Sequence, residues 1–434
     1  MSTARIIPFE ESGIRVKIRD NEVGGEEGVF YSDEEPHFLK PELGFGFNPL
    51  MLGDHLDNIN PRSTTYVVVR KLGYGGTSSV WLARRVSCVG SKHIQFFSIK
   101  VLTVNMTAGI LHDKHWERSS MKQITNANRD HAGYQHCLTL RDEFCCTSYH
   151  GPHACFVTEV LGSDLQSLRS TQPNHAFSVS ITKRIIKQVL HALEYVHREC
   201  GLVHRDVKPQ NIMVSMEASD VMIAEYLDKN PATTYEPRVE PDLSPNPIIT
   251  VRSQPLPNFG LDSTLSKLRV KLADYGESIP IEKISREYEC QPVLLRAPEV
   301  ILGYDWSTPI DIWSVGCLVF EFLTGAALFR LYESESVTLS DVHLERVIEL
   351  IGDFPPSFLA RCRKRDDYFN VEGKLLRITT LFPRTIAECV ANYKHVDSKD
   401  VGPAAKFILR CLTIDPSARP SASELLLDEW LSDV

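Results

Sequence analysis

The stretch that decides the fold is His204–Asn211, which reads His-Arg-Asp-Val-Lys-Pro-Gln-Asn and comes directly after a helical pattern. Asp206 can accept the proton of a hydroxyl group or orient that group, and Lys208 can neutralise a phosphoryl group during its transfer. Asn211 follows Asp206 by five residues and can offer a neutral oxygen ligand to Mg²⁺. Because such a combination rarely arises by chance, this stretch predicts a phosphoryl-transfer loop at the end of a buried helix.

A second candidate for metal binding is Asp274, which stands with Tyr275 and Gly276 after an apolar strand expected over residues 270–273. A carboxylate at a strand end, followed by a glycine that permits an unusual turn, suits a metal ligand. Asp-x-Gly alone is very common in proteins, so this prediction depends on the position of the motif after His204–Asn211.

A glycine-rich stretch lies at Leu72–Val80, which reads Leu-Gly-Tyr-Gly-Gly-Thr-Ser-Ser-Val, with Ser78 where a third glycine is usual. Glycines let backbone N–H groups approach phosphates without a Cβ in the way. No helix pattern follows and no Lys-Ser/Thr pair closes the stretch, which argues against a Rossmann fold and a Walker loop. A strand–loop–strand arrangement that covers ATP phosphates is favoured, and the alternative is an ordinary glycine hairpin turn. The residues expected to contact the nucleotide here are Leu72, Gly73, Tyr74, Gly75 and Val80.

A lysine inside an apolar strand, Lys100, is the next candidate. A buried lysine needs a counter-charge, because an unpaired buried cation is costly. We expect Lys100 to clamp the α- and β-phosphates and to be held by Glu117, with Asp113 and Asp130 as the other nearby acids. The alternative is a lysine on an edge strand that points to solvent.

The order of patterns along the chain predicts an α+β fold with two lobes. Strand patterns dominate from residue 66 to 102, and a Gly/Ser-rich connection is expected over 87–93. Helical patterns then dominate, at 115–126, 181–199, 310–323, 340–351, 404–412 and 421–431. We expect an N-terminal extension over 1–60, a β-rich lobe over 61–162 and a helical lobe over 163–434.

An insert over residues 215–270 interrupts the helical lobe. It contains seven prolines within 27 residues and has almost no periodicity. Such a composition predicts an extended, mobile segment whose removal leaves catalysis within a few-fold.

The composition excludes several classes of protein. The 434 residues include 47 Lys+Arg and 56 Asp+Glu, for a net charge of −9, and 43% of them are hydrophobic. This is globular, and its acidic balance argues against binding nucleic acid or a membrane surface directly. Eleven unevenly spaced cysteines predict no disulfide framework. The sequence shows no signal-peptide pattern and no uninterrupted apolar stretch that predicts a membrane-spanning helix. We therefore expect a soluble protein of the cytoplasm or nucleus.

The residues from Tyr66 to Leu431 together resemble the eukaryotic protein kinase family. Beyond the motifs above, the resemblance rests on Ala297–Glu299, on Asp311–Gly316 and on Arg419. Glu299 and Arg419 are expected to form a buried ion pair. The stretches 66–73, 78–82, 155–162 and 343–352, with the position of the insert, are similar to the SR-protein-specific kinases in a fungal-like version.

The resemblance implies a role for each matching residue. Asp206 would be the catalytic base and Lys100 the phosphate clamp, and Asn211 and Asp274 would hold Mg²⁺. Glu159 and Leu161 would offer hinge backbone groups to the adenine of ATP. The sequence departs from the family pattern at Ser98, Thr158 and Tyr275, and none of these departures removes a charge needed for phosphoryl transfer.

The function expected from the resemblance is a monomeric Ser/Thr kinase that acts on Arg/Ser-rich protein segments, with a role in mRNA splicing. Seven acids against two arginines over residues 321–353 could dock such basic substrates. One alternative is a pseudokinase scaffold. Another is a small-molecule phosphotransferase, which should lack the motifs at Ala297–Glu299, Asp311–Gly316 and Arg419.

The segment between Asp274 and Glu299 bears on regulation. It contains Ser278, Ser285 and Tyr288 but no threonine. Arg205 could await a phosphate there, yet the resemblance implies a segment that is ordered without one. We therefore expect the unmodified protein to be active.

Overall fold

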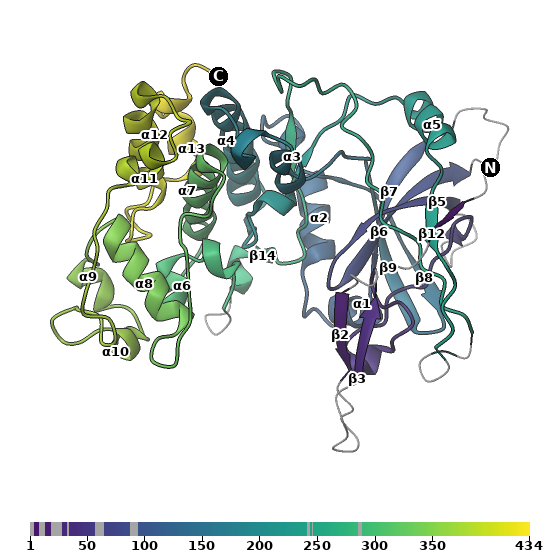
Figure 1. The fold of residues 1–434 in the computed structure, drawn as a ribbon, viewed down its shortest axis with the longest axis horizontal. Helices are drawn as coiled ribbons and strands as arrows, with labels where there is room; N and C mark the ends of the chain where they lie inside the picture. Colours follow the sequence, from purple (N-terminus) through teal and green to yellow (C-terminus); the bar gives the residue numbers. More distant parts are fainter. Residues whose placement is uncertain are drawn as a thin grey trace. The chain divides into compact units, whose positions relative to one another are not determined.

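The computed structural model describes residues 4–7, 14–18, 28–32, 34–56, 65–86, 94–240, 244, 246–284 and 289–434. The chain divides into two compact units (Figure 1). The first comprises Met1–His115, Thr139–Gly162 and Met216–Gly260, and the second comprises Trp116–Leu138, Ser163–Ser215 and Leu261–Val434. The first is rich in strands and the second in helices, which confirms the predicted α+β class.

The sheet unit is built on six antiparallel strands in the order β4-β5-β6-β7-β9-β8. Their bounds are His55–Leu56 (β4), Thr65–Tyr74 (β5), Ser78–Val86 (β6), Phe96–Leu102 (β7), Leu140–Ser148 (β8) and Gly151–Thr158 (β9). Alternate side chains of a strand share one face, so Trp81, Ile99 and Val157 stand opposite one another across β6, β7 and β9. All three are buried in one cluster with Tyr66 and form the core of the sheet.

Short elements complete this unit. They are β1 (Arg5–Ile7), which pairs in parallel with β12 (Thr233–Tyr235), the hairpin of β2 (Ile14–Ile18) and β3 (Gly28–Ser32), the 3-10 turn η1 (Pro41–Leu43), and the helices α1 (Val104–Leu111) and α5 (Asp220–Lys229). Thr103 caps α1, because its side chain accepts a hydrogen bond from the backbone N–H of Met106.

The N-terminal extension contributes to the core of the sheet unit between residues 34 and 56. Leu50 and Leu56 join the central cluster of the sheet, and Phe38 and Leu39 pack with Ile248 of the insert. The irregular sequence predicts an extension that is disordered at first and then lies along the surface, and this prediction is wrong for residues 34–56. Its apolar residues show no period, so their burial could not be seen from sequence.

The prediction of an extended, mobile insert is also wrong for the parts that the structure describes. Helix α5 brings Ile223 into a buried cluster with Leu256, Leu82 and Phe96, and Val251 joins the central cluster of the sheet. Residues 216–260 consequently group with the sheet unit, whereas the sequence placed the insert in the helical lobe. Proline-rich, aperiodic sequence rarely forms a core of its own, but scattered apolar side chains can still bury against an existing sheet.

The helical unit contains most of the helices. The longer ones are α2 (Glu117–Asn126), α4 (Val179–Glu194), α7 (Pro309–Thr324), α8 (Leu339–Leu350), α11 (Ile386–Asn392) and α12 (Ser398–Cys411). The shorter ones are α3 (Leu165–Ser170), α6 (Pro298–Ile301), α9 (Pro356–Leu359), α10 (Arg365–Tyr368) and α13 (Ala422–Leu426). One-turn helices lie at Tyr134–His136 (η2), Pro173–His175 (η3), Pro209–Asn211 (η5), Ile281–Lys283 (η6), Val293–Leu295 (η7) and Glu429–Leu431 (η8), and a π turn, η4, continues α4 at Tyr195–Glu199.

Four short strands stand among these helices. They form two antiparallel pairs, β10 (Leu202–Val203) with β14 (Ile279–Pro280) and β11 (Ile212–Val214) with β13 (Val270–Leu272). The core of the unit is α7, which is buried along nearly its whole length. A Cβ on Gly316 would lie 2.8 Å from the Cβ of Cys411, so only glycine allows α12 to pack this closely against α7.

Other predictions can be compared directly. Every cysteine that the structure describes is a free thiol, in line with the uneven spacing. No helix in the described ranges is long and apolar enough to cross a membrane. The connection predicted over 87–93 lies outside the described residues, as do Ser285 and Tyr288.

Candidate active site

The predicted transfer loop lies in the helical unit between β10 and β11, and its three polar residues meet. Lys208 Nζ lies 2.7 Å from Asp206 Oδ2. Asn211 Nδ2 donates to the same oxygen at 2.7 Å and to the backbone carbonyl of Asp206 at 2.9 Å. These bonds use the amide nitrogen of Asn211 and Oδ2 of Asp206. The other side-chain oxygens, Asn211 Oδ1 and Asp206 Oδ1, could bind a metal and accept a hydroxyl proton, respectively.

The backbone of the loop is held by Asp311, which lies in the first turn of α7. Asp311 Oδ2 and Oδ1 accept the backbone N–H groups of His204 and Arg205 at 2.8 and 2.9 Å, and His197 Nε2 lies 2.9 Å from Oδ2. Burial by itself would raise the pKa of Asp311, but its hydrogen bond to His197 and the nearby imidazoles lower that pKa below its usual range. Arg205 has a φ of +66°, a strained value that these two bonds help to maintain.

The sequence predicts Asp311 only as a part of the Asp311–Gly316 motif and does not predict this positioning role. The signal was a carboxylate at the start of an otherwise apolar helix. A fully buried acid in such a place needs several donors, and the nearest donors are often backbone groups of a functional loop.

The pairing of β11 with β13 brings the two candidate metal ligands to one end of a ladder. Ile212 stands opposite Leu272, so Asn211, just before β11, lies beside Ala273 and Asp274, just after β13. The backbone N–H of Ala273 donates to the carbonyl of Asn211 at 2.9 Å. Residues 63 positions apart in sequence are thus neighbours.

Asp274 itself is exposed and adopts a φ of +58°. Such left-handed backbone is costly for a residue with a side chain and is concentrated at functional sites. Glu117, which is buried at the start of α2, lies next to this turn. A Cβ built on Gly276 would come within 3.3 Å of Asp274 Oδ1 and 3.7 Å of Glu117 Oε2, so the glycine leaves room for both carboxylates.

Asn211 and Asp274 fit a hard divalent cation that is also bound by a nucleotide. No group of three or more His, Cys, Asp or Glu suited to a metal occurs within the described ranges. Asn211 and Asp274 supply two oxygen donors, the type that Mg²⁺ prefers. Two protein donors alone leave most of the coordination shell to water and to phosphate oxygens.

The glycine-rich stretch lies in the sheet unit, where it joins β5 to β6. The backbone N–H of Gly75 donates to the carbonyl of Ser78 at 2.8 Å, which closes the turn. A Cβ on Gly73, Gly75 or Gly76 would meet no atom of the protein within 4 Å. Because the protein's own packing does not require glycine there, the space suits a ligand that approaches the backbone.

Lys100 is half-buried on β7, directly opposite Val80 of β6. The alternative of an edge-strand lysine is wrong, because β7 lies between β6 and β9 inside the sheet. Lys100 belongs to the sheet unit and Glu117 to the helical unit. Their pairing stays a prediction.

The two predicted hinge residues follow β9 in the sheet unit. Glu159 and Leu161 are half-buried, and the hydroxyl of Thr158 donates to the carbonyl of Glu159 at 3.2 Å. Ser98 of β7 stands directly opposite Thr158. Two of the departures from the family pattern are therefore cross-strand neighbours beside the hinge.

The third departure, Tyr275, is fully buried in the helical unit. Its hydroxyl donates to the carbonyl of Leu272 at 2.8 Å, and its ring contacts His204 edge-on at a centroid distance of 5.5 Å. Burial raises the pKa of Tyr275 well above its usual value. The hydroxyl thus gains a partner that a phenylalanine would not need, and the ring still packs against the transfer loop.

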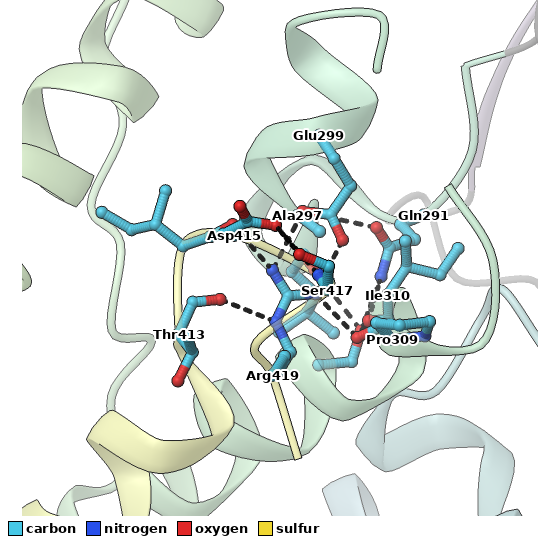
Figure 2. Close-up of polar contacts among 12 residues, drawn as sticks. Gln291, Ala297, Glu299, Pro309, Ile310, Thr413, Asp415, Ser417 and Arg419 are labelled. Atoms are coloured by element: carbon cyan, nitrogen blue, oxygen red, sulfur yellow. Dashed lines mark hydrogen bonds and ion pairs between the residues drawn. The ribbon is translucent and has the colours of Figure 1, made fainter. Parts of the chain in front are cut away.

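The expected ion pair of Glu299 and Arg419 is present and buried (Figure 2). The two nitrogens Nη1 and Nη2 of Arg419 lie 2.7 and 3.0 Å from the two carboxylate oxygens of Glu299. Nearby, the side chain of Gln291 bonds the carbonyl of Ile310 and the backbone N–H of Ala297. The segment before α6 is thereby tied to α7 and to the loop that precedes α13.

Arg205 has its partner within the chain. Its Nη2 lies 2.9 Å from Glu277 Oε2, its Nε donates to the carbonyl of Glu277, and its guanidinium lies over the ring of Trp306. Among the described residues, the segment that follows Asp274 therefore contacts Arg205 through a carboxylate.

Comparisons with known proteins agree with this geometry. A family model described as the protein kinase domain matches residues 66–227 and 258–431. The protein kinase dsk1 of Schizosaccharomyces pombe is 27% identical, with 90% of this chain and 84% of that protein covered. The serine/threonine-protein kinase SRPK of Physarum polycephalum is 28% identical, with 90% and 89% covered. SRSF protein kinase 3 of Mus musculus is 23% identical, with 92% and 91% covered.

Proposed function

The chain belongs to the protein kinase domain family and is a protein serine/threonine kinase, and from this premise we propose that it phosphorylates serines in Arg/Ser-rich protein segments. The family match confirms the resemblance drawn from the motifs, and it implies the use of ATP and a divalent metal. That the metal is Mg²⁺ belongs to the proposal, as do the roles of the single residues.

The observation that carries the proposal is the group formed by Asp206, Lys208 and Asn211. Asp206 Oδ1 accepts the proton of the substrate hydroxyl, and Lys208 stands beside it to neutralise the group in transfer. Asn211 Oδ1 and the carboxylate of Asp274 would hold the metal. Bound Mg-ATP supplies the phosphoryl group, and its metal offsets the charge on the phosphates.

In the sheet unit, the glycine-rich turn and Lys100 bind the phosphates. Lys100 and Val80 are cross-strand partners, so the amine and an apolar side chain point to the same face of the sheet. Glu159 and Leu161 offer backbone groups to adenine.

The substrate class is supported by relatives and by charge. One relative is named serine/threonine-protein kinase SRPK, and another is named SRSF protein kinase 3, a name that describes a kinase of SRSF proteins. Residues 271–434 of this chain carry 26 Asp and Glu against 18 Lys and Arg, a balance that attracts basic segments. A role in splicing and a place in the cytoplasm or nucleus are further parts of this proposal.

The acidic segment 321–353 needs a correction, because several of its acids are not on the surface. Glu321, Asp341 and Glu349 form ion pairs with Arg169, Arg377 and Arg346, respectively, and Glu345 is buried beside Arg346. Glu333, Glu335 and Asp353 are exposed, but Asp353 also pairs with Lys374, at 3.4 Å. The docking surface expected from the sequence therefore narrows to Glu333 and Glu335.

A kinase assay tests the proposal. Purified protein with Mg-ATP should phosphorylate an Arg-Ser repeat peptide faster than an acidic serine peptide of equal length. Asp206→Asn should lower kcat by about 10²–10⁴-fold, since it removes the proton acceptor. Equal rates on both peptides would contradict the substrate class. An Asp206→Asn protein that still supports the cellular function would favour the pseudokinase alternative.

Activation without phosphorylation is part of the same proposal. Arg205 is already bonded to Glu277, so no phosphate is needed to satisfy its guanidinium. Phosphatase treatment of the purified protein should leave its rate unchanged. If dephosphorylated protein were inactive and regained activity after autophosphorylation, the segment would be regulated after all.

A further inference from the structure

A buried group of charges lies next to the glycine-rich turn but is not part of the site described above. It consists of Glu34, Glu35, Lys71 and Ser253, which we name the β5 charge cluster. All members belong to the sheet unit, and Lys71 is only 1% exposed. Lys71 stands on β5 immediately before Leu72, the first residue of the stretch expected to bind nucleotide.

The bonds of the cluster join three segments that are distant in sequence. Lys71 Nζ lies 2.9 Å from Glu34 Oε2 and also bonds Glu35. The same Glu34 carboxylate accepts the backbone N–H of Ser253 at 2.8 Å and its hydroxyl at 2.6 Å. The backbone carbonyl of Lys71 accepts the N–H of Gln254 at 2.9 Å. The extension, β5 and the insert are thus fastened at one point.

This point lies at an irregularity in the pairing of β5 with β6. Lys71 stands opposite Trp81, and the register shifts between Lys71 and Gly73. The ammonium of Lys71 also lies over the rings of Tyr74 and Trp81, at 4.8 and 5.8 Å from their centroids. These contacts hold Lys71 in place directly before Leu72, where the glycine-rich stretch begins.

Stability alone does not explain why these charged residues are buried together. Two carboxylates share one ammonium in a buried place, and taking these charges out of water is expensive. Burial raises the pKa of Glu35, against the opposing effect of Lys71. Apolar side chains of similar volume could fill such a place at least as well, so a cluster of this kind suits a positional task.

We propose that the β5 charge cluster positions the glycine-rich turn for nucleotide binding, with Glu34 and Ser253 acting as positioning residues through Lys71. This inference rests on the proposed function only in taking Leu72–Val80 as the nucleotide-binding turn. The extension and the insert hold β5 at Lys71, directly before the turn, so the turn does not have to be ordered by ATP itself.

The test separates nucleotide binding from catalysis and from stability. Ser253→Ala removes the hydroxyl bond to Glu34, and Glu34→Gln removes the charge, while both keep the side-chain volume nearly unchanged. We expect the Kd of a fluorescent ATP analogue and the KM for ATP to rise about five- to tenfold, with kcat and the peptide KM within twofold. Ser253→Thr, which keeps the hydroxyl, should restore most of the affinity. Glu42→Gln, an exposed acid of the same extension, is the matched control and should bind ATP like the unchanged protein.

Each outcome decides the matter. An unchanged Kd for ATP in both variants would overturn the inference, provided that the unchanged protein binds the analogue. Equal losses in ATP binding, peptide KM and kcat, together with a lower Tm and no rescue by Ser253→Thr, would mean a purely structural role and would also overturn it. If the unchanged protein failed to bind the ATP analogue, the proposed function itself would be wrong.

Discussion

The two units each bury a cation, and they satisfy it in different ways. In the helical unit, Arg419 bonds both oxygens of Glu299 and the carbonyls of Thr413, Pro309 and Ile414, which occupies all of its N–H groups (Figure 2). In the sheet unit, Lys71 is shared by two carboxylates.

The origins of the partners differ as well. Glu299 and Arg419 both lie inside the residues that match the protein kinase domain. Lys71 does too, but Glu34 and Ser253 lie outside the match. The helical unit therefore satisfies its buried charge with the family's own residues, whereas the sheet unit depends on the extension and on the insert.

Removal of the insert should have the largest effect on stability and activity. If the sheet unit tolerated this removal, the conclusion that it depends on the insert would be wrong. Replacing residues 216–260 by a short Gly/Ser linker exposes Leu82 and Phe96 and takes away Ser253. We expect the sheet unit to lose its cooperative thermal transition and the protein its kinase activity, in contrast to the few-fold change expected from composition. Replacing residues 241–245 alone is the control. A stable, active deletion would mean that the insert adds little to the sheet.

Arg419→Met tests the helical unit. Removing one partner of a buried ion pair leaves Glu299 uncompensated, so the free energy of unfolding should fall by about 3–5 kcal/mol. Arg363→Met breaks an exposed pair with Asp305 and should cost less than about 1 kcal/mol. Urea unfolding of the two variants measures the contrast. A similar loss of unfolding free energy in both variants would show that burial does not determine how much these ion pairs stabilise the protein.

Acid should weaken both units, because each contains a histidine whose pKa is lowered, the buried His343 in the helical unit and the half-buried His37 in the sheet unit. Burial, and then the charge of Arg296, lowers the pKa of His343 in α8 to about 3, and burial with the charge of Lys71 lowers that of His37 to about 4. In the unfolded chain the pKa is about 6.5, so the unfolded state binds more protons as the pH falls below that value. Stability should therefore fall with pH from about 6.5 down to these folded pKa values, by up to about 1.4 kcal/mol per pH unit for each histidine.

Unfolding by urea at pH 7, 6 and 5 measures this slope. His343→Leu should flatten it, because the substituted side chain does not titrate. His112→Gln, at an exposed position after α1, should leave it unchanged. A slope that is identical in all three proteins would place the acid sensitivity elsewhere.

Glu35→Gln should have the smallest effect and would sharpen the comparison. Because Glu34 also neutralises Lys71, and burial raises the pKa of Glu35, the loss of one charge should change stability by less than about 1 kcal/mol. Glu299 is the carboxylate that pairs with Arg419 in the helical unit. Glu299→Gln should therefore lower the free energy of unfolding several times more than Glu35→Gln does. Equal costs would mean that the two carboxylates are not shared in the way described.

The sequence predicted those features that depend on short spacing. Asp206, Lys208 and Asn211 lie within six residues of sequence. The transfer loop, and the closeness of these three residues to one another, could therefore be predicted from one stretch. The helices α4 and α7 and the strands β5 to β7 follow from hydrophobic period. The roles assigned to the site residues stay predictions.

Features made by distant residues could not be predicted. The partner of Arg205 is Glu277, and Asp311 binds a loop more than 100 residues earlier, so neither bond has a local pattern. The burial of Ile223 and Leu256 depends on the shape of the sheet that receives them, which their own segment does not encode. The burial of Lys71 can be linked to the sequence only once the structure is known. The pattern is a lysine in an apolar strand, with two adjacent acids, Glu34 and Glu35, earlier in the chain.

The interleaving of the two units along the chain has a consequence for the order of synthesis. The sheet unit takes residues from three stretches, the last of which ends at Gly260. A nascent chain therefore has α2, α3, α4 and the transfer loop outside the ribosome before the sheet unit has all of its parts. Domains generally fold as units while they emerge, but the sheet unit does not have all of its residues until more than half of the chain has been made.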